Sequence, residues 1–421
     1  MPLHLPNFLF AALAVLGLSG CQEFRHDAKA IDHHGQFRLE TIDNSERIVI
    51  DARINGRAAR LALDTGTGGP FVVYGTSVLR LGLKVAQTPS GESPGVETKP
   101  TPGRANVVLT APAMVELLGR KLPDVQLAFL EFPSEVSSEE SEDGLIGWPA
   151  IRANLWAFDF SGNAPFIGMA DEVTSSGPGW IDFSVRDEDT LSLTFSEEGA
   201  DYPRLIIDTG NDTGVLLPPE KWREWKTAHP DAPMTIHAGY LPGQGITAKE
   251  VAWADEIRVG DLVFHGVPVE EADPAYLLQG RGREEIVALG LAALKRLFLI
   301  VDGRTKVAHA HDLDTPPQPY QHNRVGAEFI PGEGTGDDLV AHVLPGGPAY
   351  RSGIRDGDVL VTVNGRPVVG WRQDPARLKK LFNTRAPRGT TWQITVRRDG
   401  ATIPANVVAE DLLGPGLKRL R

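Results

Sequence analysis

The sequence predicts a mainly β protein in which two related β-barrel lobes are followed by a small α+β domain. Glycine and proline are frequent, 45 and 32 of 421 residues, which favours short strands joined by many turns. Two stretches repeat one strand-turn-strand pattern with the same closing motif. The C-terminal part has its own pattern of turns and strands, with a short helix and a second helix over residues 375–383. We therefore expect a duplicated β-rich body and a third domain.

The composition excludes one class of partner. Hydrophobic residues make up 41% and charged residues 23%, as in ordinary globular proteins. The formal net charge is −13, whereas binding of nucleic acid requires a basic face. The densest charged run, residues 131–144, is acidic and rich in serine, and we interpret it as a solvated loop.

The N-terminus carries a short apolar segment, FLFAALAVLGL (residues 8–18), which is typical of an export signal and too short for a membrane span. The next residues, LSGC, resemble the lipobox of bacterial lipoproteins, and Cys21 is the only cysteine. The resemblance implies a signal peptide (1–20), lipid attachment at Cys21, a tether (21–40) and a lipid-anchored position in the bacterial cell envelope, facing the periplasm or the exterior. The alternative is a cleaved signal with a chance cysteine.

The first half opens with a hairpin. RIVIDARI (47–54) is a predicted strand, and Asn55-Gly56 is a turn that strongly favours a hairpin. The returning strand, AARLAL (58–63), leads to Asp64, which begins an Asp-Thr-Gly motif.

The second half repeats this arrangement in register. The strand RLII (204–207) leads to Asp208, which also begins Asp-Thr-Gly. Gly147, preceded by two apolar residues, lies 83 residues after Asp64, and the similar Gly290 lies 82 residues after Asp208. This agreement indicates an internal duplication.

Packing of two such halves around a pseudo-twofold axis would bring Asp64 and Asp208 face to face. Two adjacent carboxylates cannot both ionise and therefore share one proton. One can then take a proton from water while the other polarises a carbonyl oxygen. We expect the Thr67 hydroxyl and the Asn211 amide to donate hydrogen bonds to the pair, and Asp212 to point to solvent.

These motifs resemble those of the aspartic proteases, in both the retropepsin-like and the pepsin-like branches, over residues 45–311. The resemblance implies lobes at 41–172 and 180–311, with Asp64 and Asp208 catalytic. Asn211 departs from the small or hydroxyl residue usual there. The residues implied to support the site are Thr65, Gly66, Thr67, Thr209, Gly210, Asn211, Gly147 and Gly290.

Two Gly- and Pro-containing segments are candidates for mobile flaps over the site, residues 90–103 and 237–245. Tyr240 in the second could contact substrate. An ordinary surface loop is the alternative for both.

The run VLPGGPAYRSGIRDGDVLVTVNGRPV (343–368) resembles a bacterial PDZ domain, here 323–410, after a Pro-rich linker at 312–322. The resemblance implies that a C-terminal or extended peptide adds as a strand and that a loop holds its carboxylate. The alternative is a domain that only packs against the lobes. The candidate loop residues are Gly326, Ala327, Glu328 and Phe329.

Together these patterns predict a membrane-anchored aspartic endopeptidase with a PDZ domain for polypeptide binding. The alternative is a catalytically inactive, peptide-binding envelope lipoprotein. We expect polypeptide substrates, a membrane contact through the lipid, no nucleic acid and a monomer. We expect no cofactor and no metal, since His309 and His311 alternate on one predicted strand without a further set of ligands.

Overall fold

The computed structural model describes residues 36–42, 45–86, 106–131, 142–160, 166–169, 179–186, 188–196, 202–241, 245–272, 285–313, 319–332, 336–371, 378 and 380–417. Cys21, the expected signal peptide and the flap candidate at 90–103 lie outside these residues, as do residues 314–318 of the Pro-rich linker.

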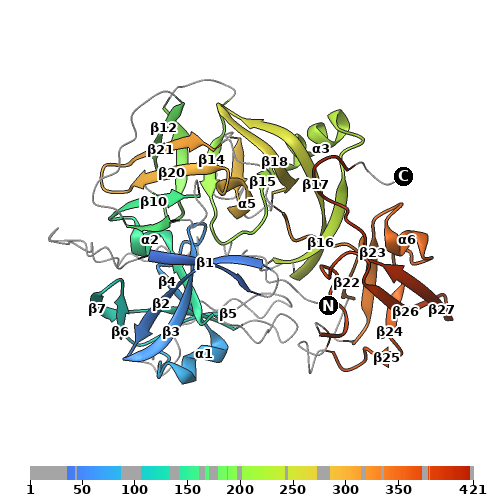
Figure 1. The fold of residues 1–421 in the computed structure, drawn as a ribbon. Helices are drawn as coiled ribbons and strands as arrows, with labels where there is room; N and C mark the ends of the chain where they lie inside the picture. The colour runs from blue at the N-terminus through green and yellow to red at the C-terminus, as the bar shows by residue number, and fades with distance from the viewer. Residues whose placement is uncertain are drawn as a thin grey trace.

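The first half is built almost entirely of strands (Figure 1). The observed strands β2 (Ser45–Ile54) and β3 (Arg57–Asp64) correspond closely to the hairpin predicted from the sequence. At their turn, Asn55 and Gly56 both have positive φ, 51° and 75°, as a two-residue hairpin turn requires. Its elements are β1 (Gln36–Ile42), β2 (Ser45–Ile54), β3 (Arg57–Asp64), β4 (Phe71–Tyr74), α1 (Gly75–Arg80), β5 (Asn106–Leu109), β6 (Ala113–Leu117), β7 (Arg120–Val125), β8 (Ala128–Glu131), β9 (Gly144–Gly147), α2 (Trp148–Ile151), β10 (Leu155–Asp159) and β11 (Phe166–Met169).

The second half has the same character, with one longer helix on its surface. Its elements are β12 (Trp180–Val185), β13 (Ser192–Phe195), β14 (Arg204–Ile207), β15 (Val215–Leu217), α3 (Pro219–Ala228), β16 (Met234–Leu241), β17 (Gly245–Val259), β18 (Leu262–Glu271), β19 (Ile286–Leu289), α5 (Leu291–Leu294), β20 (Leu297–Asp302) and β21 (Val307–Asp312).

The two halves repeat the same strand pairings. The strand that leads to Asp-Thr-Gly pairs in parallel with the strand at the apolar-Gly element, β3 with β9 and β14 with β19. The next strand pairs antiparallel with that same partner, β4 with β9 and β15 with β19. Equivalent strands β10 and β20 pair antiparallel with each other, Leu155 opposite Asp302 and Asp159 opposite Phe298. Through such pairings, the described strands of both halves form one continuous sheet.

One hydrophobic core runs through both halves. It contains edge-to-face contacts such as Phe37 with Trp156, whose ring centroids are 5.7 Å apart. Strands β4, β9, β14 and β19 are buried at every position, because both faces of these strands are covered by other parts of the protein.

The C-terminal domain has its own sheet, in the order β22-β23-β24-β26-β27 with β25 beside β24. Phe382 packs edge-on against Phe329 and Trp392 at the centre of its core. The mainly β class with a small C-terminal domain is therefore confirmed. The elements are β22 (Ala327–Pro331), β23 (Leu339–Val343), α6 (Pro348–Arg351), β24 (Val359–Val363), β25 (Arg366–Pro367), β26 (Thr391–Arg398) and β27 (Ala401–Val408).

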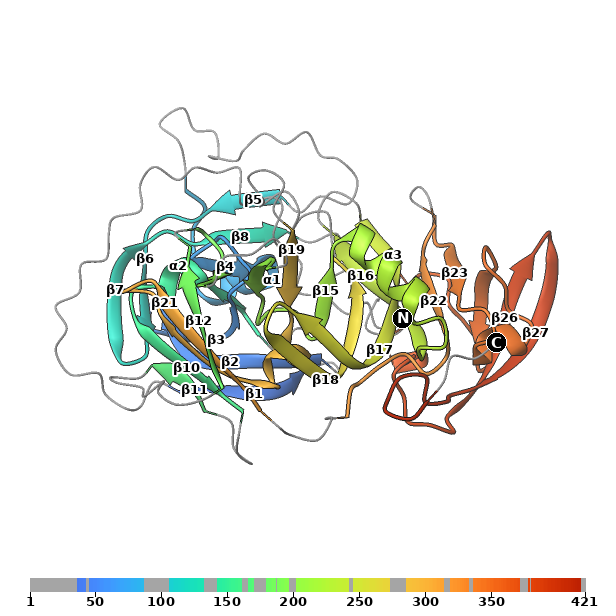
Figure 2. The ribbon, with the colours of Figure 1, turned by 90° about the horizontal axis from the view of Figure 1, so that it is seen from above.

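This domain packs against β16 and β17 of the second half (Figure 2). Ala238 of β16 belongs to the domain's own core, and Ile246 and Ala248 of β17 pack against that core. Leu413, near the C-terminus, packs on Trp253 of β17. The domain is therefore docked through apolar contacts.

Within the described part of the chain, no helix combines the length and the apolar character that a membrane span needs.

Candidate functional site

The two Asp-Thr-Gly turns meet at the junction of the halves. Asp64 ends β3 and Asp208 directly follows β14, and both are buried, with 1% and 0% of their surface exposed. A Cβ on Gly66 would lie 2.7 Å from Asp208 Cγ, and a Cβ on Gly210 would overlap the Asp64 carboxyl group. Each carboxyl group thus lies against the glycine of the other turn, and only glycine leaves room for it.

The two threonines of the motifs brace the turns reciprocally. The Thr65 hydroxyl donates a hydrogen bond to Ile207 O (2.6 Å) and accepts one from Thr209 N (3.2 Å). The Thr209 hydroxyl donates to Leu63 O (3.0 Å) and accepts from Thr65 N (3.0 Å). Each hydroxyl therefore bonds the opposite strand just before its aspartate.

The glycines after the apolar pairs lie under these turns. Gly147 N donates to Pro70 O (3.1 Å), and Gly290 N donates to Gly214 O (2.8 Å). A Cβ on Gly147 would lie 2.6 Å from Thr67 Cγ2, and one on Gly290 would lie 2.5 Å from Thr213 O. The close approach of each strand to the turn thus depends on the missing side chain.

The electrostatics of the pair favour a bound proton. Burial raises the pKa of Asp64 well above its usual value, and the charge of Asp208 and a hydrogen bond to its carboxyl group raise it further. Arg47 and the Gly66 amide oppose this rise. Because the two carboxyl groups are buried at the same junction, they cannot both ionise easily and one proton is retained between them. Such a pair can take up a proton and donate one at the same place.

The expected hydrogen bonds from Thr67 and Asn211 to the pair are not formed. The Thr67 hydroxyl and the Asn211 amide nitrogen are buried and have no hydrogen-bond partner among the described residues. The Asn211 side-chain oxygen instead accepts bonds from the Thr213 amide and hydroxyl, both at 2.8 Å. The asparagine therefore stabilises its own loop.

The expectation that Asp212 points to solvent was wrong. Its side chain is only 12% exposed and accepts a hydrogen bond from Ser45 Oγ at 2.6 Å. Arg385 Nη1 of the C-terminal domain lies 3.3 Å from the same carboxylate oxygen. Asp212 thus joins the loop after Asp208 to β2 and to the C-terminal domain.

This junction was not predictable from the sequence. Ser45 and Arg385 are 167 and 173 residues away from Asp212 along the chain. Neither residue belongs to a repeated pattern, so no sequence signal pointed to their contact with the loop.

His237 of β16 lies in the same buried region. Burial is the main cause that lowers the pKa of His237 to about 3, and the positive charges of Arg385 and Lys249 lower it further. The imidazole is therefore neutral at ordinary pH. Its Nε2 approaches Glu270 Oε2 at 3.4 Å, but a neutral ring makes this a polar contact and not an ion pair. Glu270 Oε1 lies 3.2 Å from the Thr213 hydroxyl oxygen, and this contact connects the region to the Asp208 loop.

Tyr240 lies in β16, where its backbone pairs with Ile246 of β17. The hairpin that carries it packs against the C-terminal domain through Ala238. Residues 242–244 at the tip of the hairpin, and the Tyr240 side chain, lie outside the described part of the structure.

The candidate carboxylate-binding loop is closed by its own chain. Val325 N and Gly326 N both donate to the Asn323 side-chain oxygen, at 2.8 and 2.9 Å. Ala327 and Phe329 are fully buried. Glu328 is buried too and accepts a bond from the Asn323 side chain at 2.9 Å. Burial raises the pKa of Glu328 to about 7.

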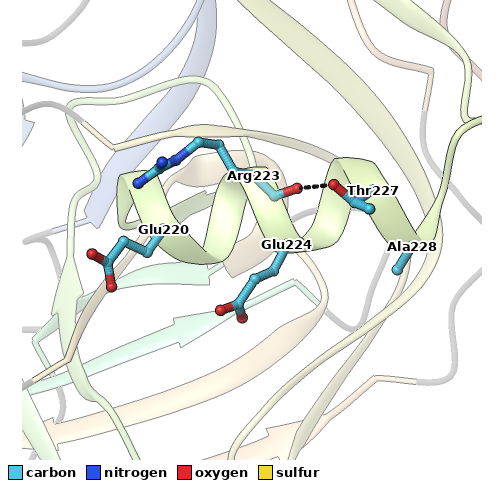
Figure 3. Close-up of a pocket in the computed structure, with 5 residues that line it drawn as sticks. All are labelled: Glu220, Arg223, Glu224, Thr227 and Ala228. Atoms are coloured by element: carbon cyan, nitrogen blue, oxygen red, sulfur yellow. Dashed lines mark hydrogen bonds between the residues drawn. The ribbon is translucent and has the colours of Figure 1, made fainter.

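A surface hollow lies elsewhere, along helix α3, as Figure 3 shows. Glu220, Arg223, Glu224, Thr227 and Ala228 line it. The Thr227 hydroxyl bonds to the carbonyl of Arg223 within the helix, at 2.8 Å. These side chains form a solvated helix face and contribute nothing to the carboxyl pair. Within the described residues no group of three or more His, Cys, Asp or Glu could hold a metal ion.

Comparison with known proteins identifies the family of one part of the chain. Residues 339–397 match the PDZ domain family. The chain is similar to the putative serine protease HhoA of Synechocystis sp., with 47% identity over 68 residues, and to the serine protease HTRA1 of Xenopus tropicalis, with 26% identity over 80 residues. The alignments cover 16% and 19% of this chain and 16% of each relative. The chain thus spans about a sixth of the length of these curated relatives.

These relatives contradict the expected enzyme class. Both are named serine proteases, so the assignment as an aspartic endopeptidase is corrected. The assignment depended on two turns that place carboxyl groups together, and such an arrangement does not by itself determine the reaction of the whole protein. The expectation for the C-terminal part is confirmed: it is a PDZ domain.

Proposed function

We propose that this chain is a PDZ-containing protease that binds polypeptides through its C-terminal domain. The match of residues 339–397 to the PDZ family carries the proposal, because such domains bind peptides. The names of the two similar proteins support proteolysis as the activity. They share only a limited part of their length with this chain, which is why the activity stays a proposal.

The proposed domain organisation follows the sequence and the repeated pairings. Residues 41–172 and 180–311 are two lobes, 312–322 is the linker and 323–410 is the PDZ domain. The identical order of pairings in the two halves supports this division.

The N-terminal proposals are a signal peptide over residues 1–20, a tether over 21–40 and lipid attachment at Cys21. They place the protein in the bacterial cell envelope. They depend on the LSGC motif.

We further propose that Asp64 and Asp208 form one acid–base site. Their mutual burial, the contact of each carboxyl group with the glycine of the opposite turn and the raised pKa of Asp64 support this role. The remaining motif residues form, or pack against, the two turns that carry the pair: Thr65, Gly66, Thr67, Thr209, Gly210, Asn211, Gly147 and Gly290. Residues with a raised pKa in contact with a second titratable group are typical of functional sites, although structural pairs share this property.

The protease proposal is tested by cleavage of a peptide library. The full chain is compared with and without a sulfonyl fluoride that modifies active-site serines. Cleavage of the library supports the proposal, and the effect of the reagent assigns the class. A folded full chain that leaves the library uncut from pH 4 to 8 would overturn it.

The acid–base site is tested separately, with Asp64→Asn and Asp208→Asn. The matched control is Asp302→Asn, because Asp302 lies at the end of β20 and bonds Arg304 at the surface. If the pair takes part in the reaction, either variant alone should lower cleavage about as much as both together, since the two groups would act as a unit. Unchanged cleavage in both pair variants would remove the pair from the reaction.

A further inference from the structure

The edge strand of the PDZ sheet lies against the second half of the protein. β22 is at the end of its sheet and pairs only with β23 within the described sheet. β16 and β17 contact β22 from outside the sheet (Figure 1). Side chains on both faces of β22 are buried, including Glu328 at 2% and Ile330 at 8% exposure. A peptide that adds to a sheet needs an exposed edge strand.

The loop before β22 is also occupied. The Val325 and Gly326 amides are bonded to the Asn323 side chain, so they are not free to hold a carboxylate. The Thr235 hydroxyl of β16 donates to the Asn323 carbonyl oxygen at 2.6 Å. A residue of the second half therefore bonds the residue that closes this loop.

The docked domain also contacts the loop after Asp208. Arg385 of the PDZ domain lies on Asp212, which Ser45 bonds from the first half. The Arg385 and Asp212 side chains are 5% and 12% exposed. Their contact is therefore shielded from solvent, where breaking a charge pair has a larger effect than at the surface.

We propose that the surface of the PDZ domain around β22 is the docking surface for the chain's own β16–β17 hairpin, so that docking and peptide uptake exclude each other. Arg385 is then a positioning residue: it contacts Asp212 when the PDZ domain is docked, and this contact holds the domain against the loop after Asp208. The part that concerns peptide uptake rests on the proposed peptide binding by the PDZ domain. The docking itself stands on the contacts alone.

The first experiment measures docking in the full chain by amide hydrogen exchange. Arg385→Gln and Thr235→Val each remove one polar contact across the junction. The control, Arg397→Gln, removes an exposed pair with Asp338 on the same domain. We expect faster exchange in β16 and β22 together for both junction variants and no change for the control. Unchanged exchange in β16 and β22 of both variants would overturn the docking.

The second experiment uses a fluorescent peptide with a free, apolar C-terminus and its amidated counterpart. We expect weak binding to the wild-type chain and binding at least about tenfold tighter to the two junction variants, because opening exposes β22 and removes the Thr235 bond that holds Asn323 over the loop amides. Amidation should remove the gain. Equal affinity for wild type and variants would overturn the exclusion. Faster exchange without any peptide binding would instead overturn the peptide-binding proposal while supporting the docking.

A double-mutant cycle tests the positioning role. Asp212→Asn and Arg385→Gln are compared singly and together by the same exchange measurement. If Arg385 acts through Asp212, the double variant should open β16 and β22 no more than Arg385→Gln alone. Additive effects would overturn this coupling.

Discussion

The two Asp-Thr-Gly loops have the same backbone and different surroundings. Thr67 N donates to Asp64 O and Asn211 N donates to Asp208 O, so each turn closes in the same way. Beyond the turn they diverge. The first loop continues with Thr67, whose buried hydroxyl has no partner among the described residues. The second continues with Asp212, which bonds two other parts of the molecule. The shared turn positions the carboxyl pair, and the unshared residues connect one loop to the PDZ domain.

The largest expected effect comes from a change in the shared part. Gly210→Ala places a Cβ where the Asp64 carboxyl group lies. We expect the free energy of unfolding to fall by about 3 kcal/mol or more, because backbone and carboxyl group must both move. Chemical denaturation measures this. Gly336→Ala is the control, since its Cβ would meet nothing within 4 Å. Equal stability of the two variants would contradict the close packing of the turns.

A pH-dependent effect is expected at the docked side. The folded-state pKa of Glu328, about 7, lies above its usual 4.5. Burying the protonated Glu328 carboxyl group therefore costs no ionisation energy below about pH 4.5. As pH rises from 4.5 to 7, the free energy of unfolding falls by about 3 kcal/mol in all, because the unfolded chain loses this proton first. Glu328→Gln should therefore stabilise the protein relative to wild type at pH 8 and not at pH 4. Denaturation curves at both pH values measure this difference.

Glu410→Gln is the control for that measurement, because Glu410 pairs with Arg351 at the surface. If the free energy of unfolding of Glu328→Gln changed with pH in parallel with that of wild type from pH 4 to 8, the raised pKa of Glu328 would be contradicted.

His237 should give the opposite pH dependence. Because its pKa is lowered to about 3, the stability that comes from the buried neutral imidazole is complete above about pH 6.5 and is lost on acidification.

The reciprocal hydroxyls should respond alike. Thr65→Val and Thr209→Val each remove one donor and one acceptor from the same bracing network. We expect each to lower the free energy of unfolding by about 2 kcal/mol, and the double variant to lose less than the sum. Markedly unequal single losses, measured by denaturation, would show that the bracing is not symmetric.

The smallest effect is expected at Thr67. Its hydroxyl is buried without a described partner, so Thr67→Val should be neutral or stabilise the protein by up to about 1 kcal/mol. Asn211→Leu should destabilise it, because the Asn211 side-chain oxygen bonds Thr213. A loss of stability in Thr67→Val would point to a hydrogen bond that forms in solution.

The sequence was sufficient to predict that the two Asp-Thr-Gly turns meet. It was not sufficient to predict the contact of Asp212 with Ser45 and Arg385. Identical motifs at matched spacing predicted that Asp64 and Asp208 would meet, because a duplicated chain repeats its pairings. The environment of Asp212 depends on residues far along the chain, and the charge of an aspartate favours an exposed position by default. The PDZ domain was predictable because its turns and strands are consecutive in the sequence. Its docking was not, since apolar residues such as Ala238 carry no signal for a partner.

The pairing of β10 with β20 has one more consequence. These strands hold equivalent places in the two halves, and they meet as the same strand would meet its copy at the isologous interface of a homodimer. In a homodimer, every substitution appears on both sides of the axis. A single chain is free of that constraint, so one loop can keep Thr67 while the other acquires Asn211 and Asp212. Covalent fusion thus allows one side of a symmetric centre to acquire a contact of its own while the other side keeps the geometry.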